Sequence, residues 1–226
     1  MHYVRSVLTI AAKDLRSEFR SKEAINASLS FSLVVLLLLS FAFDPNSEQV
    51  REFSGGLLWL VFAFAGTLIL NRSFARELGN DCLDALLASP LPSSALYLGK
   101  CVANWALLFM LELACLPVFG IFYNITWTAQ IPGLLLVIAI GTWALTVIGT
   151  MFSALTVNLR LRELMLPILV YPMMIPALLG AIQLTTDLLA GKPLSADNML
   201  WVRLLVGFDV IFTALSVALV DTVLVG

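Results

Sequence analysis

The chain has 226 residues, of which 60% are hydrophobic and only 12% are charged, and its mean hydropathy is +0.97. Water-soluble domains are about 45–50% apolar and about 25% charged, so this composition excludes an ordinary soluble globule. The net charge of −2 argues against a nucleic-acid partner. His2 is the only histidine, which excludes most mechanisms that need an internal imidazole, and we expect no catalytic residue.

The cysteines predict neither a metal site nor a cluster site. Cys82, Cys101 and Cys115 form no Cys-x-x-Cys pair and have no histidine cluster nearby, so we expect free thiols and no bound metal. The first 23 residues are a long charged stretch rather than the short basic start of a signal peptide. We therefore expect no cleaved leader.

An amphipathic helix is predicted over residues 1–23. Basic residues lie mostly away from its apolar stripe, and we expect the helix to lie along the inner membrane surface near anionic head groups. A solvated N-terminal extension is the alternative. The apolar residues that recur at helical spacing are Val4, Val7, Leu8, Ala11, Leu15 and Phe19.

Uncharged stretches predict the membrane spans. Stretches of 20, 19 and 23 residues follow Glu23, Glu52 and Glu163, each close to the roughly 20 residues that cross a bilayer. The 47 uncharged residues over 113–159 would form a helix about 70 Å long, so we expect a turn at 124–133. The six predicted spans are 24–43, 53–71, 101–123, 131–157, 164–186 and 204–224.

The positions of the basic residues predict the orientation. Ten of the 13 Lys and Arg residues fall in the N-terminal segment and in the 72–100 and 158–163 loops. The positive-inside rule therefore places both termini and these two loops in the cytoplasm.

The 72–100 loop is too charged for the membrane, yet Leu83, Leu86 and Leu87 have helical spacing, and Pro90 and Pro92 end any helix there. Two interpretations remain open. The segment is either a partly apolar element that binds a cytoplasmic partner, or a second interfacial helix without a partner.

Three acidic residues fall in predicted spans. Glu112, midway along the third span, is either a coupling or gating residue or a neutral carboxyl bonded to a neighbouring helix. Asp209 and Asp221 in the last span are expected to reach the membrane interfaces.

Five motifs, taken together and in order, make the chain similar to the CcmB family, the permease subunits of the cytochrome c maturation ABC complex, also called haem exporter protein B. The resemblance covers nearly the full chain. The motifs are Arg16-Ser17-Glu18-Phe19-Arg20-Ser21-Lys22-Glu23, Gly56-Leu57-Leu58-Trp59, the Arg72 to Pro90 segment, Tyr97-Leu98-Gly99-Lys100 and Asn158-Leu159-Arg160-Leu161-Arg162-Glu163-Leu164-Met165-Leu166-Pro167.

The resemblance implies an all-α polytopic membrane protein of the ABC-2-type exporter permease fold. Residues 1–226 would form a single transmembrane permease domain, with 1–23 as a cytoplasmic interfacial helix and 72–100 as the coupling loop that docks on a separate ATPase. Lys100 would anchor the third span. The chain has no Gly-x-x-x-x-Gly-Lys-[Ser/Thr] motif, so ATP is expected only on the partner, and the chain is expected not to be an enzyme. The implied coupling residues are Arg76, Glu77, Asp81, Asp84, Leu86, Leu87 and Pro90.

The resemblance also implies the bacterial inner membrane, a homodimer of the permease, and four kinds of partner. These are an ABC ATPase subunit (CcmA-like), a haem-handling membrane subunit (CcmC-like), a small membrane subunit (CcmD-like) and a periplasmic haem chaperone (CcmE-like). ATP hydrolysis would be coupled to haem delivery or to release of the haem-loaded chaperone. No cofactor is expected to be covalently bound, and haem would be a transported or partner-bound ligand.

Three other functions are alternatives to this one. Another ABC-2-type exporter, for lipid, polysaccharide or drug, would share the interfacial helix and the loop. An intramembrane protease is disfavoured because no span contains a histidine and Asp209 and Asp221 lie too far apart along one helix to act together. A channel is disfavoured because no filter motif or acidic cluster is present.

Overall fold

The computed structural model describes residues 2–43, 47–77, 91–124, 130–157, 159 and 161–224, and the regular structure in these ranges is helical. A short 3-10 turn over 75–77 follows α3. The elements are α1 (His2–Ser21), α2 (Glu23–Ala42), α3 (Glu48–Ser73), α5 (Ser93–Phe122), α6 (Ile131–Thr156), α7 (Arg162–Leu189), the 3-10 helix η2 (Ala196–Asn198) and α8 (Met199–Leu224).

Among the described residues, six helices are long and apolar enough to cross a membrane, which confirms the predicted six-span, all-α chain. These are α2, α3, α5, α6, α7 and α8. The predicted fold-back is also present, because α5 ends at Phe122 and α6 begins at Ile131. Asn124 has a φ of 48°, in the left-handed region that asparagine tolerates in turns.

Three helices begin several residues earlier than the predicted spans, among them α3, which begins at Glu48 rather than at residue 53. Residues 93–100 of the expected loop are the first turns of α5, and α8 begins at Met199 rather than at residue 204. A proline at position 92 has a backbone angle suited to the entry of a helix, so α5 starts directly after it. Charged residues limit the part of a helix that hydrocarbon can surround, but they do not end the helix itself.

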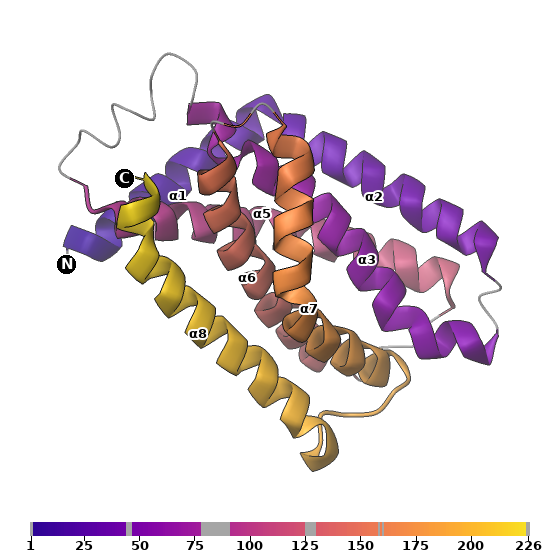
Figure 1. Cartoon of the computed structure of the whole chain (residues 1–226). Helices are drawn as coiled ribbons and strands as arrows, with labels where there is room; N and C mark the ends of the chain where they lie inside the picture. The colour runs from indigo at the N-terminus through magenta and orange to yellow at the C-terminus, as the bar shows by residue number, and fades with distance from the viewer. Residues whose placement is uncertain are drawn as a thin grey trace.

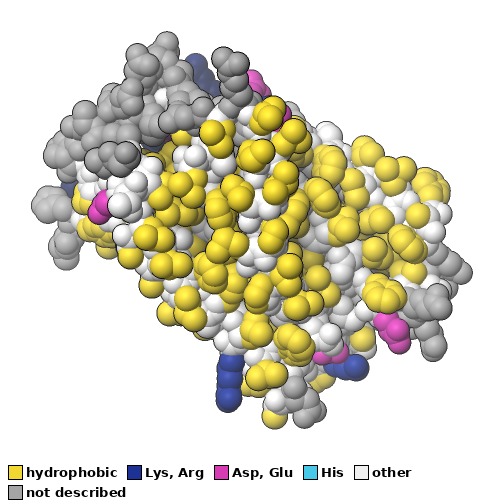
Figure 2. All heavy atoms as spheres, viewed as in Figure 1, with side chains coloured by type: hydrophobic (Ala, Val, Ile, Leu, Met, Phe, Trp, Pro, Cys, Tyr) yellow, Lys and Arg dark blue, Asp and Glu magenta, His cyan; other side chains and the backbone are white. Residues whose placement is uncertain are grey.

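Figure 1 shows the helices as one bundle in which α2 and α8 lie at opposite edges. In the apolar 18-residue stretch of each helix, only 22% of the residues of α2 and 28% of those of α8 are buried, whereas 67% of those of α3 are buried. α3 therefore lies in the interior of the bundle. Apolar side chains cover most of the visible face over α8, α7 and α2 in Figure 2, and the few visible charges lie near its edges. Such a surface suits contact with lipid.

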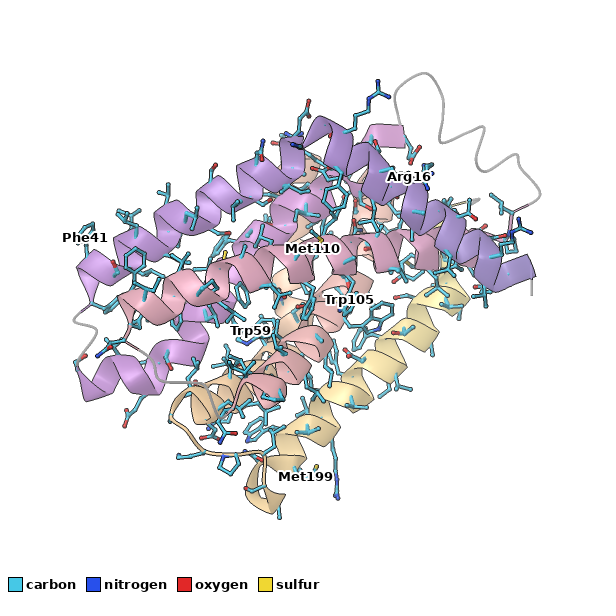
Figure 3. All side chains as sticks on the ribbon, turned by 180° about the vertical axis from the view of Figure 1, so that it is seen from behind. Arg16, Phe41, Trp59, Trp105, Met110 and Met199 are labelled. Atoms are coloured by element: carbon cyan, nitrogen blue, oxygen red, sulfur yellow. The ribbon has the colours of Figure 1, made fainter. Side chains whose placement is uncertain are left out.

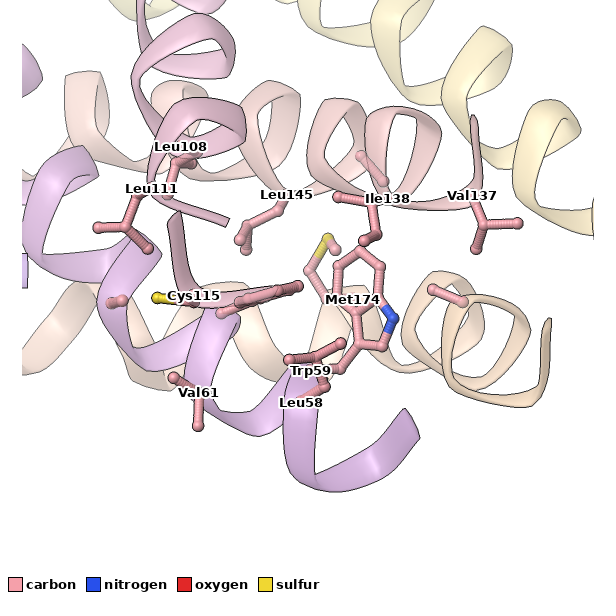
Figure 4. Packing of buried hydrophobic residues seen from close by; sticks show 14 of the residues in the cluster. Leu58, Trp59, Val61, Leu108, Leu111, Cys115, Val137, Ile138, Leu145 and Met174 are labelled. Atoms are coloured by element: carbon pink, nitrogen blue, oxygen red, sulfur yellow. The ribbon is translucent and has the colours of Figure 1, made fainter. Parts of the chain in front are cut away.

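The core lies where α3, α6 and α7 meet. The ring of Trp59 on α3 is 1% exposed and lies beside Ile138 of α6 and Met174 of α7 (Figure 4). Its indole Nε1 donates a 2.9 Å hydrogen bond to Thr185 Oγ1 of α7. The buried polar end of this large ring is therefore satisfied, and the bond ties two spans together.

Candidate coupling site

The N-terminal helix packs across the start of α5 at the end of the bundle that also carries the end of α3 (Figures 1 and 3). Ile10 and Ala11 of α1 are buried, and a Cβ atom on Gly99 would lie 2.7 Å from Cβ of Ile10. Only glycine at position 99 allows α1 to come this close to α5. The close approach places the polar residues of α1 next to Lys100.

Lys100 is a fully buried cation in the second turn of α5. Its Nζ lies 3.1 Å from Asp14 Oδ2 of α1, 3.1 Å from Glu77 Oε1 and 2.9 Å from the Ser73 carbonyl oxygen. It also lies 4.9 Å from the centroid of the Phe74 ring. These contacts compensate the cost of burying the charge.

A second cation, Lys13, pairs with the same two carboxylates, those of Asp14 and Glu77. Lys13 Nζ lies 2.6 Å from Glu77 Oε1 and 3.1 Å from Asp14 Oδ1. Partial burial alone would lower the pKa of Lys13, but the hydrogen bond to Glu77 and the charge of Asp14 outweigh it and raise the pKa above its ordinary value. Lys13 therefore stays charged across the physiological range.

A further ion pair joins Arg76 to Glu18 of α1, and the Glu18 side chain is fully buried. Glu18 Oε1 also accepts a 2.9 Å hydrogen bond from the Ile25 amide in the first turn of α2. The N-cap residue of α2, Lys22, has a φ of 57° and gives no side-chain cap, so Glu18 satisfies an amide that the α2 terminus leaves open. One carboxylate thus fixes both the corner between α1 and α2 and the residues that follow α3.

We call these six residues, three acids and three bases, the ionic cluster: Lys13, Asp14, Glu18, Arg76, Glu77 and Lys100. It joins α1, α5 and the 3-10 turn after α3. Asn104, one turn beyond Lys100, extends the connection by donating 2.9 Å hydrogen bonds to Ser73 Oγ and to Thr150 Oγ1 of α6. A displacement of residues 75–77 would therefore be transmitted to three helices.

The implied coupling residues divide into two groups. Arg76 and Glu77 lie in the ionic cluster and pair with α1 and α5 of their own chain. Their side chains hold the base of the loop in place. The other implied coupling residues, Asp81, Asp84, Leu86, Leu87 and Pro90, lie outside the described residues.

Asp14 and Glu18 of α1 were not among the predicted site residues, because only the basic residues of that helix were given a role, at the lipid head groups. Asp14 and Glu18 are four residues apart, and they continue the face that begins with the buried Ile10 and Ala11. Acidic residues on the same helix face as buried apolar residues could have indicated that this face packs against protein.

Glu112 is fully buried in α5, and Thr142 Oγ1 of α6 donates a hydrogen bond to its Oε2. Its Oε1 has no hydrogen-bond partner within the described part of the chain. This geometry fits the interpretation of a carboxyl bonded to a neighbouring helix.

Replacing Thr142 by valine is expected to lower the free energy of unfolding by about 1–3 kcal/mol, because the buried carboxyl loses its donor. Glu112→Gln keeps an acceptor for Thr142 and is expected to cost less. Unfolding in mild detergent measures both, with Thr222→Val, an exposed threonine bonded to its own helix, as the control. If Glu112→Gln abolished ATP-coupled function in a stable protein, the carboxyl would have a mechanistic role instead.

Asp209, which was expected to reach a membrane interface, is buried against neighbouring helices. It is 9% exposed and follows the start of α8 by ten residues, or about 15 Å. Its Oδ1 is buried and accepts no hydrogen bond from the residues that the structure describes. Asp221 is exposed near the end of α8, as an interfacial position requires.

Comparison with known proteins decides the family. A family model described as CcmB protein matches residues 5–223, almost the whole chain. The chain belongs to the CcmB family. It is therefore a permease subunit of the cytochrome c maturation system and is not itself an enzyme.

Curated members of the CcmB family align over most of the chain. The "Heme exporter protein B" of Pseudomonas aeruginosa is 29% identical over 212 residues, which are 92% of this chain and 93% of that protein. The protein of the same name in Rhodobacter capsulatus is 31% identical over 175 residues, 77% of this chain and 80% of its own. The protein of that name in Paracoccus denitrificans is 30% identical over 185 residues, which are 81% of this chain and 84% of that protein.

Proposed function

We propose that this CcmB-family chain transmits work from a separate ABC ATPase to a haem-handling assembly on the outer side of the bacterial inner membrane. The ionic cluster is the observation that carries this proposal. It connects the base of the 78–90 segment to α1 and α5 through several charge-assisted bonds, so a force on that segment reaches the spans. The names of the relatives support haem as the ligand that is exported.

The orientation in this proposal follows from charge. The basic residues of α1 lie at the end of the bundle that carries the ionic cluster, together with Arg72, Arg76 and Lys100, and the positive-inside rule makes this end cytoplasmic. Both chain termini then lie in the cytoplasm.

We also infer that α1 is an interfacial helix with two different faces. Ile10, Ala11 and Glu18 are turned toward protein and are buried, whereas Val4 and Leu8 are 62% and 57% exposed. An exposed apolar stripe beside basic residues is typical of a helix that lies at the head-group level. In this position α1 would hold the ionic cluster at the membrane surface.

The partners in this proposal are the ATPase, a haem-handling membrane subunit, a small membrane subunit, a periplasmic haem chaperone and a second copy of the permease. The ABC-2-type exporter architecture requires two permease copies. Haem would be bound by the partners or transported, and ATP would be bound by the ATPase alone.

Co-purification of the ATPase in mild detergent tests the proposal. The wild-type chain is expected to retain the ATPase, and Leu86→Asp or Asp84→Arg is expected to reduce recovery by roughly thirtyfold, because a contact residue at the centre of an interface contributes about 2 kcal/mol or more. Asp221→Arg is the matched control, since Asp221 is an exposed acid near the same end of the bundle but on α8. Full recovery with both loop variants would show that the ATPase binds elsewhere on the chain.

A further inference from the structure

A groove of about 650 Å³ lies between α2, α3 and α7 at the end of the bundle that carries the ionic cluster. Its walls are the first turns of α2 and α7 and the last turns of α3, which meet at this end in Figure 1. The groove is amphipathic along its length. The residues that the argument uses are Glu23, Phe31, Phe64, Asn71, Arg72 and Glu163.

The inner part of the groove is aromatic. Phe31 of α2 and Phe64 of α3 are 37% and 44% exposed, and their ring centroids are 6.5 Å apart. Phe64 also contacts the ring of Tyr171 on α7, with a centroid separation of 5.4 Å. Exposed apolar rings of this kind, in a helix surface that faces the membrane, suit a hydrocarbon chain.

The outer part of the groove carries charges of both signs. Arg72 Nη1 lies 2.6 Å from Glu23 Oε2, and these side chains are 44% and 70% exposed, so both can bind a further group. Glu163 at the start of α7 is exposed on the same groove, and Arg76 lines it as well. Two guanidinium groups and two carboxylates favour a ligand that carries both a negative and a positive charge.

Asn71 indicates which positively charged group the ligand carries. Its Oδ1 is buried at the groove and has no hydrogen-bond partner in the described ranges. A buried acceptor without a donor costs about 1–3 kcal/mol, so a ligand with N–H groups would relieve that cost. A primary ammonium has three N–H donors, whereas a trimethylammonium has none.

We propose that this groove binds phosphatidylethanolamine. The phosphate pairs with the guanidinium of Arg72, the primary ammonium donates to Asn71 Oδ1, and an acyl chain lies along Phe31 and Phe64. This lipid site is independent of the coupling to an ATPase. It would anchor the α2, α3 and α7 ends to one zwitterionic lipid beside the ionic cluster.

Native mass spectrometry of the purified full-length chain with equimolar phosphatidylethanolamine, phosphatidylcholine and phosphatidylglycerol of identical acyl composition tests the proposal. We expect the wild type to retain at least ten times as much phosphatidylethanolamine as phosphatidylcholine, because one additional hydrogen bond to a charged group contributes about that factor in affinity. Asn71→Leu is expected to reduce this preference to within about twofold, and Asn71→Asp, which keeps an acceptor, is expected to preserve it. Arg72→Gln is expected to weaken retention of phosphatidylethanolamine and of phosphatidylcholine alike, because each carries the phosphate that Arg72 binds.

Arg203→Gln is the control, since Arg203 is an exposed basic residue at the opposite end of the bundle, and it should leave retention unchanged. Equal retention of the ethanolamine and choline lipids by the wild type would overturn the proposal. So would a disulfide-linked dimer of Leu164→Cys in a Cys82→Ser background that retains no lipid, because the groove would then be filled by a second copy of the chain.

Discussion

Lys100→Met is expected to lower the free energy of unfolding by about 3 kcal/mol, the lower end of the cost of breaking a buried ion pair, because Asp14 and Glu77 must then share Lys13 alone. The ammonium of Lys100 is shared by Asp14 and Glu77, whose side chains are only 16% and 11% exposed. Methionine keeps an apolar stem beside Phe74, so the change removes mainly the charge. Unfolding in mild detergent, followed by helix content, measures the loss.

Lys192→Met is the matched control for this prediction. Lys192 also pairs with an aspartate, at 3.3 Å, but its side chain is 70% exposed. Exposed ion pairs contribute about 0–1 kcal/mol, so the control should remain close to wild type. Equal stability of the two variants would show that the ionic cluster does not hold the helices together.

A double variant separates charge from packing. In Lys100→Met with Glu77→Gln, the cluster loses one negative charge together with the positive charge, and Asp14 keeps Lys13 as its partner, so part of the lost stability should return. Trypsin cleavage within α1 should follow the same order, fastest in Lys100→Met alone, because α1 is held by this cluster. Identical cleavage of the single variant and the wild type would contradict the role assigned to Lys100.

Gly55→Ala is expected to lower the free energy of unfolding by about 3 kcal/mol, near the upper end of the usual cost of overpacking. A Cβ atom at position 55 would lie 2.5 Å from the Ile182 carbonyl oxygen and 2.8 Å from the Thr186 amide nitrogen of α7. Because these are backbone atoms, no side-chain rotation relieves the clash, and α3 and α7 must separate. Close approach of two spans through a small residue is a common way to pack helices in membranes.

Gly56→Ala provides the control at the next position of the same helix. The nearest atom to a Cβ atom there is Ile182 Cγ2 at 3.9 Å, an ordinary contact. Alanine should therefore leave stability unchanged or raise it by about 0.5–1 kcal/mol through its better helix propensity. A detergent unfolding series that ranks Gly56→Ala below Gly55→Ala would contradict the packing of α3 on α7.

Local patterns in the sequence were enough to predict the number, type and order of the spans. Uncharged stretches of bilayer length and the polar break near residue 124 predicted six long helices, and the structure has them. The physical reason is local. A span must be long, apolar and internally hydrogen-bonded, and each of these requirements appears in consecutive residues.

The pairing of the charged residues could not be predicted in this way, because it depends on how the helices pack. Asp14 and Lys100 are 86 positions apart in the chain, and their contact depends on the approach of α1 to α5 at Gly99. The burial of Asp209 likewise depends on the helices that pack against α8. The energy of a charged group is set by neighbours brought together in space, and the order of residues along one helix does not specify those neighbours.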